Sequence, residues 1–322
     1  MEIVNQKVDE VLNKVTIEDF AQSFGTATED IPETCRRMIW KKDFRYRIIE
    51  GSDRDQLILD VLRKTDEDRQ TIGVPERRDV WQKGWDENLQ NFAGSGLDLN
   101  TLVPKFIRPN QVIRFNRNYI MPVDPDFELN YFSVFRTWLF DKYFEKFHNV
   151  YDFGCGSGLN LASLAQLYPH KSFHGLDFVP SSKDLINRIG AAHSWDMKGH
   201  LFDMIHPDEN IDIEEDSVVC TFGAIEQLAS QFEAFLQFLL KRSPSLCVHV
   251  EPTVELYDET SLIDYLAIRF HKKRGYTENF LPRLRELEAL GRIRLLKVKR
   301  LFFGSLLMEG YSLIIWTCAK GD

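Results

Sequence analysis

The feature that most constrains the fold is a regular alternation of strand-like and helix-like segments that begins near residue 148. Patterned apolar runs predict strands at Val150–Phe153, Ser172–Asp177, Gly199–Asp203, Ser217–Phe222 and Leu246–Glu251. Apolar residues at helical spacing predict helices at Leu159–Leu167, Ser181–Ala192, Phe232–Lys241 and Asn279–Leu290. Strands that alternate with helices form βαβ units, so we expect an α/β fold with a Rossmann-like, mostly parallel sheet.

The end of the chain breaks this alternation. Two strand-like runs, Arg292–Arg300 and Tyr311–Cys318, follow one another with no helix between them. A direct return of this kind predicts that the last strand runs antiparallel.

The first part of the chain has a different pattern and is expected to be mainly helical. Trp81, Trp85, Leu89 and Phe92 lie on one helical face, and glycines at 94 and 96 end that helix. The segment 106–125, rich in Asn, Arg and Pro, predicts a connector with few strands. We therefore expect a helical cap or lid over residues 1–125 and a second domain over 126–322. The aromatic residues of the cap are expected in its core: Trp81, Trp85, Phe115 and Tyr119.

Charge and cysteine content limit the classes of function. The 322-residue chain has a formal net charge of −9, which disfavours nucleic-acid binding because phosphates require a basic surface. No apolar stretch approaches the roughly 20 residues of a membrane span, and residues 1–7 show no signal-peptide pattern. The five cysteines form no C-x-x-C pair and predict reduced thiols. These features predict a cytoplasmic protein.

The segment most informative about chemistry is Tyr151-Asp152-Phe153-Gly154-Cys155-Gly156-Ser157-Gly158-Leu159-Asn160. It follows a predicted strand and opens a predicted helix, the context in which a glycine loop approaches a ligand. A nicotinamide fingerprint, G-x-G-x-x-G, would need glycine at position 159, where Leu159 stands. The spacing is instead G-x-G-x-G, with Asp152 two residues before the first glycine.

This arrangement resembles the class I S-adenosylmethionine (AdoMet)-dependent methyltransferases over residues 128–322. The resemblance implies a seven-stranded sheet with an antiparallel last strand, and AdoMet as cofactor. It also implies an acid after the second strand for the ribose hydroxyls, which is Asp177, and an acid after the third for the adenine, which is Asp203. The implied cofactor-binding residues are Asp152, Gly154, Gly156, Gly158, Asp177, Phe178, Asp203, Met204 and Phe222.

Two absences favour a metal-free O-methyltransferase. The fourth predicted strand ends in Thr221-Phe222-Gly223-Ala224, where enzymes that methylate amide or base nitrogens carry an Asp/Asn-Pro-Pro-Tyr type of segment. It also lacks the Asp-Asn pair that holds a divalent metal in catechol-type enzymes.

Three residues are candidates for the catalytic base; Glu251 is expected to act at the acceptor, and His271 and Glu226 are the alternatives. Glu251 ends the predicted fifth strand, at the edge of the sheet where ligands of α/β folds bind. Glu226 follows the fourth strand; many members of the family have Glu-His where this chain has Glu226-Gln227. His271 lies in a predicted helix that begins near Ser261. His249, deeper in the fifth strand, is expected to be a core histidine.

The identity of the methyl acceptor is less constrained. The cationic run Arg269-Phe270-His271-Lys272-Lys273-Arg274 predicts either an ordinary helix C-terminus or a site for an anionic substrate. Together with Glu251-Pro252 and the run from Tyr311 to Trp316, it resembles methyltransferases associated with bacterial surface-polysaccharide synthesis. That resemblance implies a sugar hydroxyl as acceptor. The alternatives are a nicotinamide-dependent oxidoreductase and an AdoMet-binding protein without catalysis, and a homodimer is compatible with the sequence.

Overall fold

The computed structural model describes residues 12–74 and 76–319. The first eleven residues, on which the expectation of no signal peptide rests, therefore lie outside the described part. Within the described residues, no helix is both long and apolar enough to cross a membrane. All five cysteines are free thiols, as expected, and four of them are buried.

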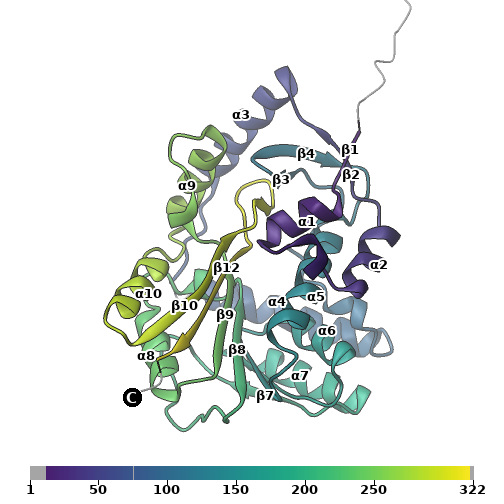
Figure 1. Cartoon of the computed structure of the whole chain (residues 1–322). Coiled ribbons are helices and arrows are strands. Elements are labelled where there is room, and N and C mark those ends of the chain that lie inside the picture. Colours follow the sequence, from purple (N-terminus) through teal and green to yellow (C-terminus); the bar gives the residue numbers. More distant parts are fainter. Residues whose placement is uncertain (1–11, 75, 320–322) are drawn as a thin grey trace, which may run out of the picture.

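A seven-stranded sheet forms the centre of the molecule (Figure 1). Its strands, in spatial order, are β7 (Met197–Leu201), β6 (Ser172–Asp177), β5 (Asn149–Phe153), β8 (Ser217–Phe222), β9 (Leu246–Glu251), β12 (Ser312–Cys318) and β10 (Ile293–Arg300). Strands β7, β6, β5, β8 and β9 run parallel, and β12 is antiparallel to both of its neighbours. The predicted fold class, including the antiparallel last strand, is thus confirmed.

Helices cover both faces of this sheet, which explains why its strands read as continuous apolar runs. They are α5 (Phe127–Tyr143), α6 (Leu159–Leu167) and α7 (Pro180–His193) on one face, and α8 (Glu233–Arg242) and α10 (Phe280–Ala289) on the other. Neighbouring residues of one strand alternate between the two cores: Val218 packs with α5 and α6, and Val219 with α8.

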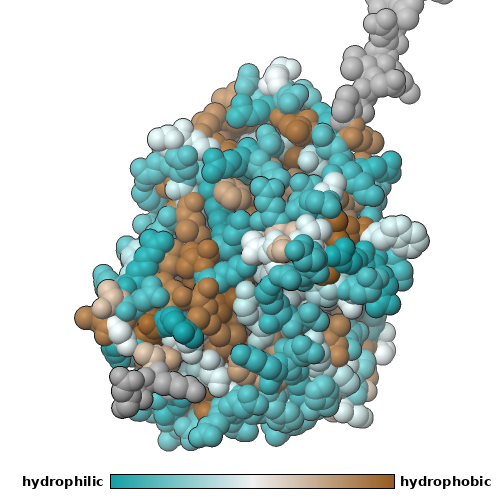
Figure 2. Space-filling view, in the orientation of Figure 1, coloured by the Kyte–Doolittle hydropathy of each residue, from teal (hydrophilic) through white to brown (hydrophobic). Residues whose placement is uncertain are grey.

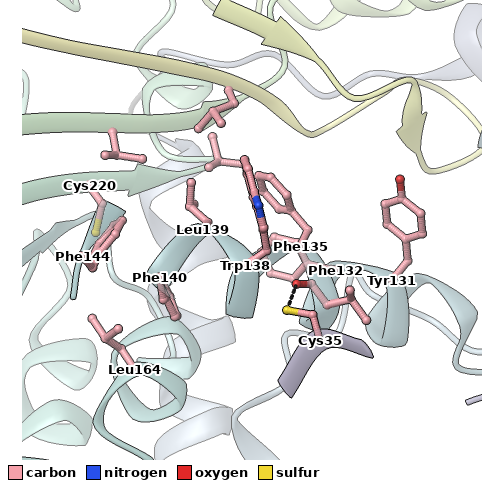
Figure 3. Close-up of a cluster of buried hydrophobic side chains, with 14 of the residues drawn as sticks. Cys35, Tyr131, Phe132, Phe135, Trp138, Leu139, Phe140, Phe144, Leu164 and Cys220 are labelled. Atoms are coloured by element: carbon pink, nitrogen blue, oxygen red, sulfur yellow. Dashed lines mark hydrogen bonds between the residues drawn. The ribbon is translucent and has the colours of Figure 1, made fainter. Parts of the chain in front are cut away.

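Helix α5 is the element on which the N-terminal helices pack. Its aromatic residues form a continuous buried surface, including Phe135, Trp138 and Phe140 (Figure 3). The Cys35 thiol of α2 (Glu33–Lys41) donates to the Val134 carbonyl oxygen at 3.6 Å. Aromatic rings bury large apolar areas, so α5 joins the N-terminal helices to the sheet through hydrophobic packing.

The N-terminal region is helix-rich, as predicted, but it also contains strands where a connector was expected. Its other helices are α1 (Ile17–Phe24), α3 (Gly51–Glu67) and α4 (Glu76–Gly94). A second, five-stranded sheet has the order β1 (Asn13–Lys14), β2 (Arg45–Ile48), β4 (Asn118–Pro122), β3 (Ile113–Phe115) and β11 (Phe303–Gly304). Strands β3 and β4 form a hairpin whose turn residues, Asn116 and Arg117, have φ of 46° and 62°. The prediction missed this hairpin because its turn lacks glycine.

Strand β11 reaches this second sheet from the far end of the chain. Residues 303–304 complete a sheet otherwise built from the first 122 residues, so this sheet contains segments from both sides of the proposed domain boundary. The boundary between residues 125 and 126 remains a prediction.

The outer edge of the large sheet is partly apolar. Strand β10 is its edge strand, and Leu296 of this strand and Leu290, just after α10, are 45% and 69% exposed. Figure 2 shows hydrophobic residues gathered over β10, β12 and α10 on an otherwise mostly hydrophilic face. That this protein forms a homodimer remains a prediction.

A buried cluster of charged side chains connects the two sheets. Arg300 at the end of β10 donates two hydrogen bonds of 2.6 Å to Asp264 of α9 (Leu262–Arg274), and two of 2.6 and 2.9 Å to Glu309. Arg114 of β3 lies 3.5 Å from Asp264 and is fully buried. Two arginines thus face two carboxylates away from water, and the bidentate bonds of Arg300 to both carboxylates offset part of their desolvation.

Arg300→Ala should lower the free energy of unfolding by about 3–5 kcal/mol, because it leaves two buried carboxylates facing Arg114 alone. Urea denaturation measures this difference. The matched control is Arg283→Ala, which removes a half-exposed pair with Glu233 and should cost at most about 1 kcal/mol. Equal losses for the two variants would contradict the central role given to the Arg300 cluster.

Candidate functional site

The glycine loop connects β5 to α6 at the carboxyl ends of the parallel strands, where ligands bind in open α/β sheets. Gly154, Gly156 and Gly158 all have positive φ, between 52° and 75°. The Gly154 N–H donates to the carbonyl oxygen of Leu176 in β6 at 2.7 Å. The loop is therefore fastened to the neighbouring strand in a conformation that residues with a Cβ rarely adopt.

Close approach by other parts of the chain also requires two of these glycines. A Cβ at Gly154 would lie 2.4 Å from the Cβ of Ala224, which follows β8. A Cβ at Gly156 would lie 2.6 Å from the indole of Trp85. The loop thus lies in contact with both the turn after β8 and helix α4.

Asp177 at the end of β6 is bonded directly to this loop. One carboxylate oxygen accepts from the Gly156 N–H and the other from the Val179 N–H, each at 3.0 Å. Burial raises the pKa of Asp177 to about 6, against the opposing effect of these backbone bonds. The predicted ribose-binding acid therefore lies at the glycine loop and keeps lone pairs free for further donors.

A cavity of about 300 Å³ lies beside the loop, Asp177 and α4. Of the sequence-predicted cofactor residues, those in its wall are Gly154, Asp177, Phe178, Asp203 and Met204. The remaining ones, which do not form its wall, are Asp152, Gly156, Gly158 and Phe222. Phe222 packs instead against Phe132 and Phe140 of α5.

Asp203 lies two residues beyond β7, because that strand ends at Leu201 rather than at residue 203. One of its oxygens accepts from the Ile205 N–H at 2.9 Å. The other pairs with Arg78 of α4 at 2.9 Å, and the Arg78 guanidinium lies 4.3 Å from the centre of the Phe178 ring. Through Arg78, helix α4 is thereby attached to Asp203 and Phe178, two of the predicted cofactor-binding residues.

Two tryptophans of α4 form part of the cavity wall. Trp81 and Trp85 stack with ring centres 5.6 Å apart, and both are only partly buried. The expectation that they belong to the core is wrong, whereas Phe115 and Tyr119 are buried as expected. The sequence analysis also missed Arg77 and Arg78, although their spacing from Trp81 and Trp85 places all four along one side of a helix.

Asp152 is the acid of the site that has the fewest hydrogen-bond donors around its carboxylate. It is 1% exposed; the Cys220 thiol lies against its carboxylate, and no N–H or O–H group of the described residues donates to it. Burial, together with the charges of Asp177 and Glu251, raises its pKa to about 8. A buried carboxylate without donors is costly, so this position suits a cationic ligand group.

Glu251 at the end of β9 is bonded to the turn that follows β8. Its carboxylate accepts from the backbone N–H groups of Ala224 at 3.1 Å and Glu226 at 3.2 Å. It is 3% exposed, and burial raises its pKa to about 7. Glu251 therefore holds the turn containing the 3-10 helix Ile225–Leu228, which contributes to the cavity wall.

Glu226 lies beside the cavity wall without forming part of it. A Cβ placed on Gly223, a wall residue, would lie 4.0 Å from its Oε1. The side-chain amide of the next residue, Gln227, donates to that oxygen at 2.7 Å. Burial and the negative charge of Glu251 raise the pKa of Glu226 to about 8.

His271 lies in α9 behind this turn and is fully buried. Its Nε2 is 3.0 Å from the carbonyl oxygen of Thr277, and the hydroxyl of Thr277 donates to the carbonyl oxygen of Ile225. Burial lowers the pKa of His271 to about 4, so it is neutral at pH 7. The structure thus connects His271 to the turn through Thr277 rather than placing it in the cavity wall.

The cationic end of α9 is paired with acids near the end of α3. Arg269 contacts Asp66 at 2.5 Å and Arg274 contacts Asp68 at 2.7 Å. His249 is a core histidine, as expected, since Thr221 and Trp316 bond its two ring nitrogens. No group of three His, Cys, Asp or Glu side chains arranged to hold a metal occurs among residues 12–74 and 76–319.

No protein-family model matches this sequence, and no curated protein matches it either. Several solved structures are similar to this chain at low sequence identity. The O-methyltransferase NcsB1 from neocarzinostatin biosynthesis, in complex with S-adenosylmethionine and 2-hydroxy-5-methyl naphthoic acid, is 15% identical. The alignment covers 58% of this chain and 57% of that one, with a TM-score of 0.39.

Two further structures show how varied these similar proteins are. The plantazolicin methyltransferase BpumL, in complex with SAH, is 13% identical, with coverage of 59% and 82% and a TM-score of 0.38. A branched-chain polyamine synthase mutein from Thermus thermophilus is 11% identical, with 60% of each chain covered and a TM-score of 0.42. The chain thus spans less than two thirds of NcsB1 and of the polyamine synthase. Similarity at this level shows neither which reaction this chain catalyses nor which acceptor it uses.

Glu251→Ala should lower the free energy of unfolding by about 1–3 kcal/mol, because it leaves two buried N–H donors without an acceptor. Glu251→Gln, which keeps one acceptor oxygen, should recover part of this loss. The control is Glu288→Ala, which removes an acceptor for the Leu295 N–H at an exposed position and should cost less. Urea denaturation that shows no difference between the Glu251→Ala variant and the wild type would contradict the anchoring role.

Proposed function

We propose that this protein transfers a methyl group from AdoMet to a hydroxyl group of a small molecule, such as a sugar. The observation that carries the proposal is the contact between the glycine loop and the buried Asp177 carboxylate at the rim of a cavity. Phosphate-binding loops of dinucleotide enzymes use a third glycine where Leu159 begins α6. The G-x-G-x-G spacing instead favours AdoMet.

The residues present fit this cofactor at three places. The two oxygens of Asp177 would accept from ribose hydroxyls, and Asp203 with Met204 would hold the adenine. The buried, unbonded carboxylate of Asp152 would receive the ammonium group of the methionine part. The aromatic rings of α4 would cover the bound cofactor and exclude water from it.

AdoMet supplies a methyl carbon bound to positively charged sulfur, so the cofactor carries its own activation. The chain must then orient the acceptor hydroxyl and take its proton. We assign the proton to Glu226, the candidate base beside the cavity wall. In this transfer the acceptor oxygen would take the methyl carbon, the sulfur would keep the electron pair of the carbon–sulfur bond, and the Glu226 carboxylate would hold the proton.

Glu251 and His271 support Glu226 in this proposal. Glu251 orients the turn that carries Glu226, and its charge keeps Glu226 basic. His271 positions the same turn through Thr277.

Asp177→Ala should weaken AdoMet binding at least about tenfold, since charge-assisted bonds contribute roughly 1.5–3 kcal/mol. Isothermal titration calorimetry with AdoMet measures the change, and titration with NADH tests the nicotinamide alternative. The control, Asp196→Ala, removes an exposed acid outside the cavity wall and should bind as wild type. Normal AdoMet binding by a folded Asp177→Ala protein, or tight NADH binding by the wild type, would refute the cofactor assignment.

Glu226→Gln should lower turnover by about 10²–10⁴-fold while AdoMet affinity stays within about threefold. In the wild type, kcat/KM should rise with pH through about 8, because the active form of Glu226 is unprotonated and its pKa is raised. The variant should lose this rising limb.

Glu251→Gln provides the companion measurement. Removing the negative charge that raises the pKa of Glu226 should move the rising limb to lower pH without abolishing it. A wild-type pH profile in Glu226→Gln would exclude Glu226 as the base. Complete loss of the limb in Glu251→Gln would assign that role to Glu251.

A further inference from the structure

Arg78 of α4 lies in the cavity wall and contacts two predicted cofactor residues from the other half of the chain. Its Nη1 donates to Oδ2 of Asp203 at 2.9 Å, and its guanidinium lies 4.3 Å from the centre of the Phe178 ring. All three residues line the same cavity. The N-terminal region thus supplies a charged side chain to the end of the cavity where the adenine is expected.

The carboxylate of Asp203 is held from two sides and still has room for a donor. Oδ1 accepts from the Ile205 N–H at 2.9 Å, whereas Oδ2 accepts from Arg78 and lies 3.5 Å from Nδ1 of His206. A carboxylate oxygen has about two lone-pair positions, so Oδ1 keeps one of them. Partial burial acts to raise the pKa of Asp203, but the bonds from Ile205 and Arg78 hold that pKa below its usual value. At neutral pH Asp203 is therefore ionised and can only accept.

An acceptor fixed in this way distinguishes between purine bases. Adenine has an exocyclic amino group that donates hydrogen bonds. Hypoxanthine has a carbonyl oxygen in its place, which would meet the lone pairs of Asp203 without forming a bond. The neighbouring ring nitrogen of hypoxanthine carries a hydrogen, however, and a carboxylate that was free to turn could accept from it. Selection of adenine therefore requires that the carboxylate be held in one orientation.

We propose that Arg78 is a positioning residue for the base of the cofactor, and that it makes the cavity select adenine by holding Asp203 in place. A guanidinium suits this role, because one nitrogen bonds the carboxylate while the planar group lies over the Phe178 ring. The inference rests on the proposed AdoMet site and adds a residue of α4 to base recognition. Since the ionic contact is half-exposed, it should contribute little to folding and act chiefly on base selection.

The first test is isothermal titration calorimetry of the full wild-type chain with S-adenosylhomocysteine and with S-inosylhomocysteine, its deaminated analogue. The wild type should bind the adenosyl compound at least about tenfold more tightly, because a site built to bond an amino group rejects an analogue that lacks it. Equal binding of the two compounds would overturn the proposal. Binding of neither would instead refute the AdoMet site on which it rests.

The second test measures the ratio of these two affinities in variants of Arg78. In Arg78→Met the ratio should fall about threefold or more, because Asp203 can then turn toward the ring nitrogen of the inosyl compound. Arg78→Lys, which keeps a cation beside Asp203, should recover part of the ratio. The matched control is Lys83→Met, which removes an exposed cation of the same helix outside the cavity wall and should keep the wild-type ratio.

A double-mutant cycle separates positioning from a general loss of affinity. Asp203→Asn should remove the base preference by itself, and adding Arg78→Met should then leave the ratio unchanged, because both residues act through the same carboxylate. An unchanged ratio in a folded Arg78→Met protein would overturn the proposal. Tighter binding of S-adenosylhomocysteine by that variant would also overturn it, since Arg78 would then occupy the place of the base.

Discussion

Mutual repulsion among buried carboxylates is the constraint on which the candidate site depends. Asp152, Asp177 and Glu251 stand at or near the ends of β5, β6 and β9, and each is at most 5% exposed. Like charges this far from water cannot all be ionised unless donors or cations compensate them. Asp177 and Glu251 each accept two backbone hydrogen bonds, whereas Asp152 accepts none from the described residues. The arrangement therefore leaves one acid whose charge no backbone donor of the described residues compensates.

The sequence predicted the central sheet well because each of its strands carries a local signal. The strands Ser172–Asp177, Ser217–Phe222 and Leu246–Glu251 have the predicted bounds, since apolar runs buried on both faces stand out from their polar flanks. The predicted bounds of the third strand lie two residues too late. Met197 is buried and pairs with Phe173, so the strand begins earlier than its apolar content suggested. Asp203 nevertheless lies in the cavity wall, because the carboxyl ends of parallel strands meet at the same edge of the sheet.

That helix α4 forms part of the cavity wall could not be predicted in the same way. Trp81 and Trp85 have the spacing of core residues, and nothing in that spacing says which partner their helix covers. The contact between Trp85 and Gly156 joins positions 71 residues apart. The roles of Glu226 and Glu251 depend on the same kind of information: both are acids near strand ends, and only the bonds to Ala224 and Glu226 distinguish an anchoring carboxylate from one beside the cavity.

The cluster of Arg300, Asp264, Glu309 and Arg114 has a consequence for how a ligand enters. It fastens the second sheet and α9 to the edge of the large sheet, so these parts should open only when much of the molecule unfolds. Helix α4 lies outside that cluster, and the ionic contact of Arg78 with Asp203 is half-exposed. The side of the cavity formed by α4 is therefore the part of its wall that this cluster does not hold in place.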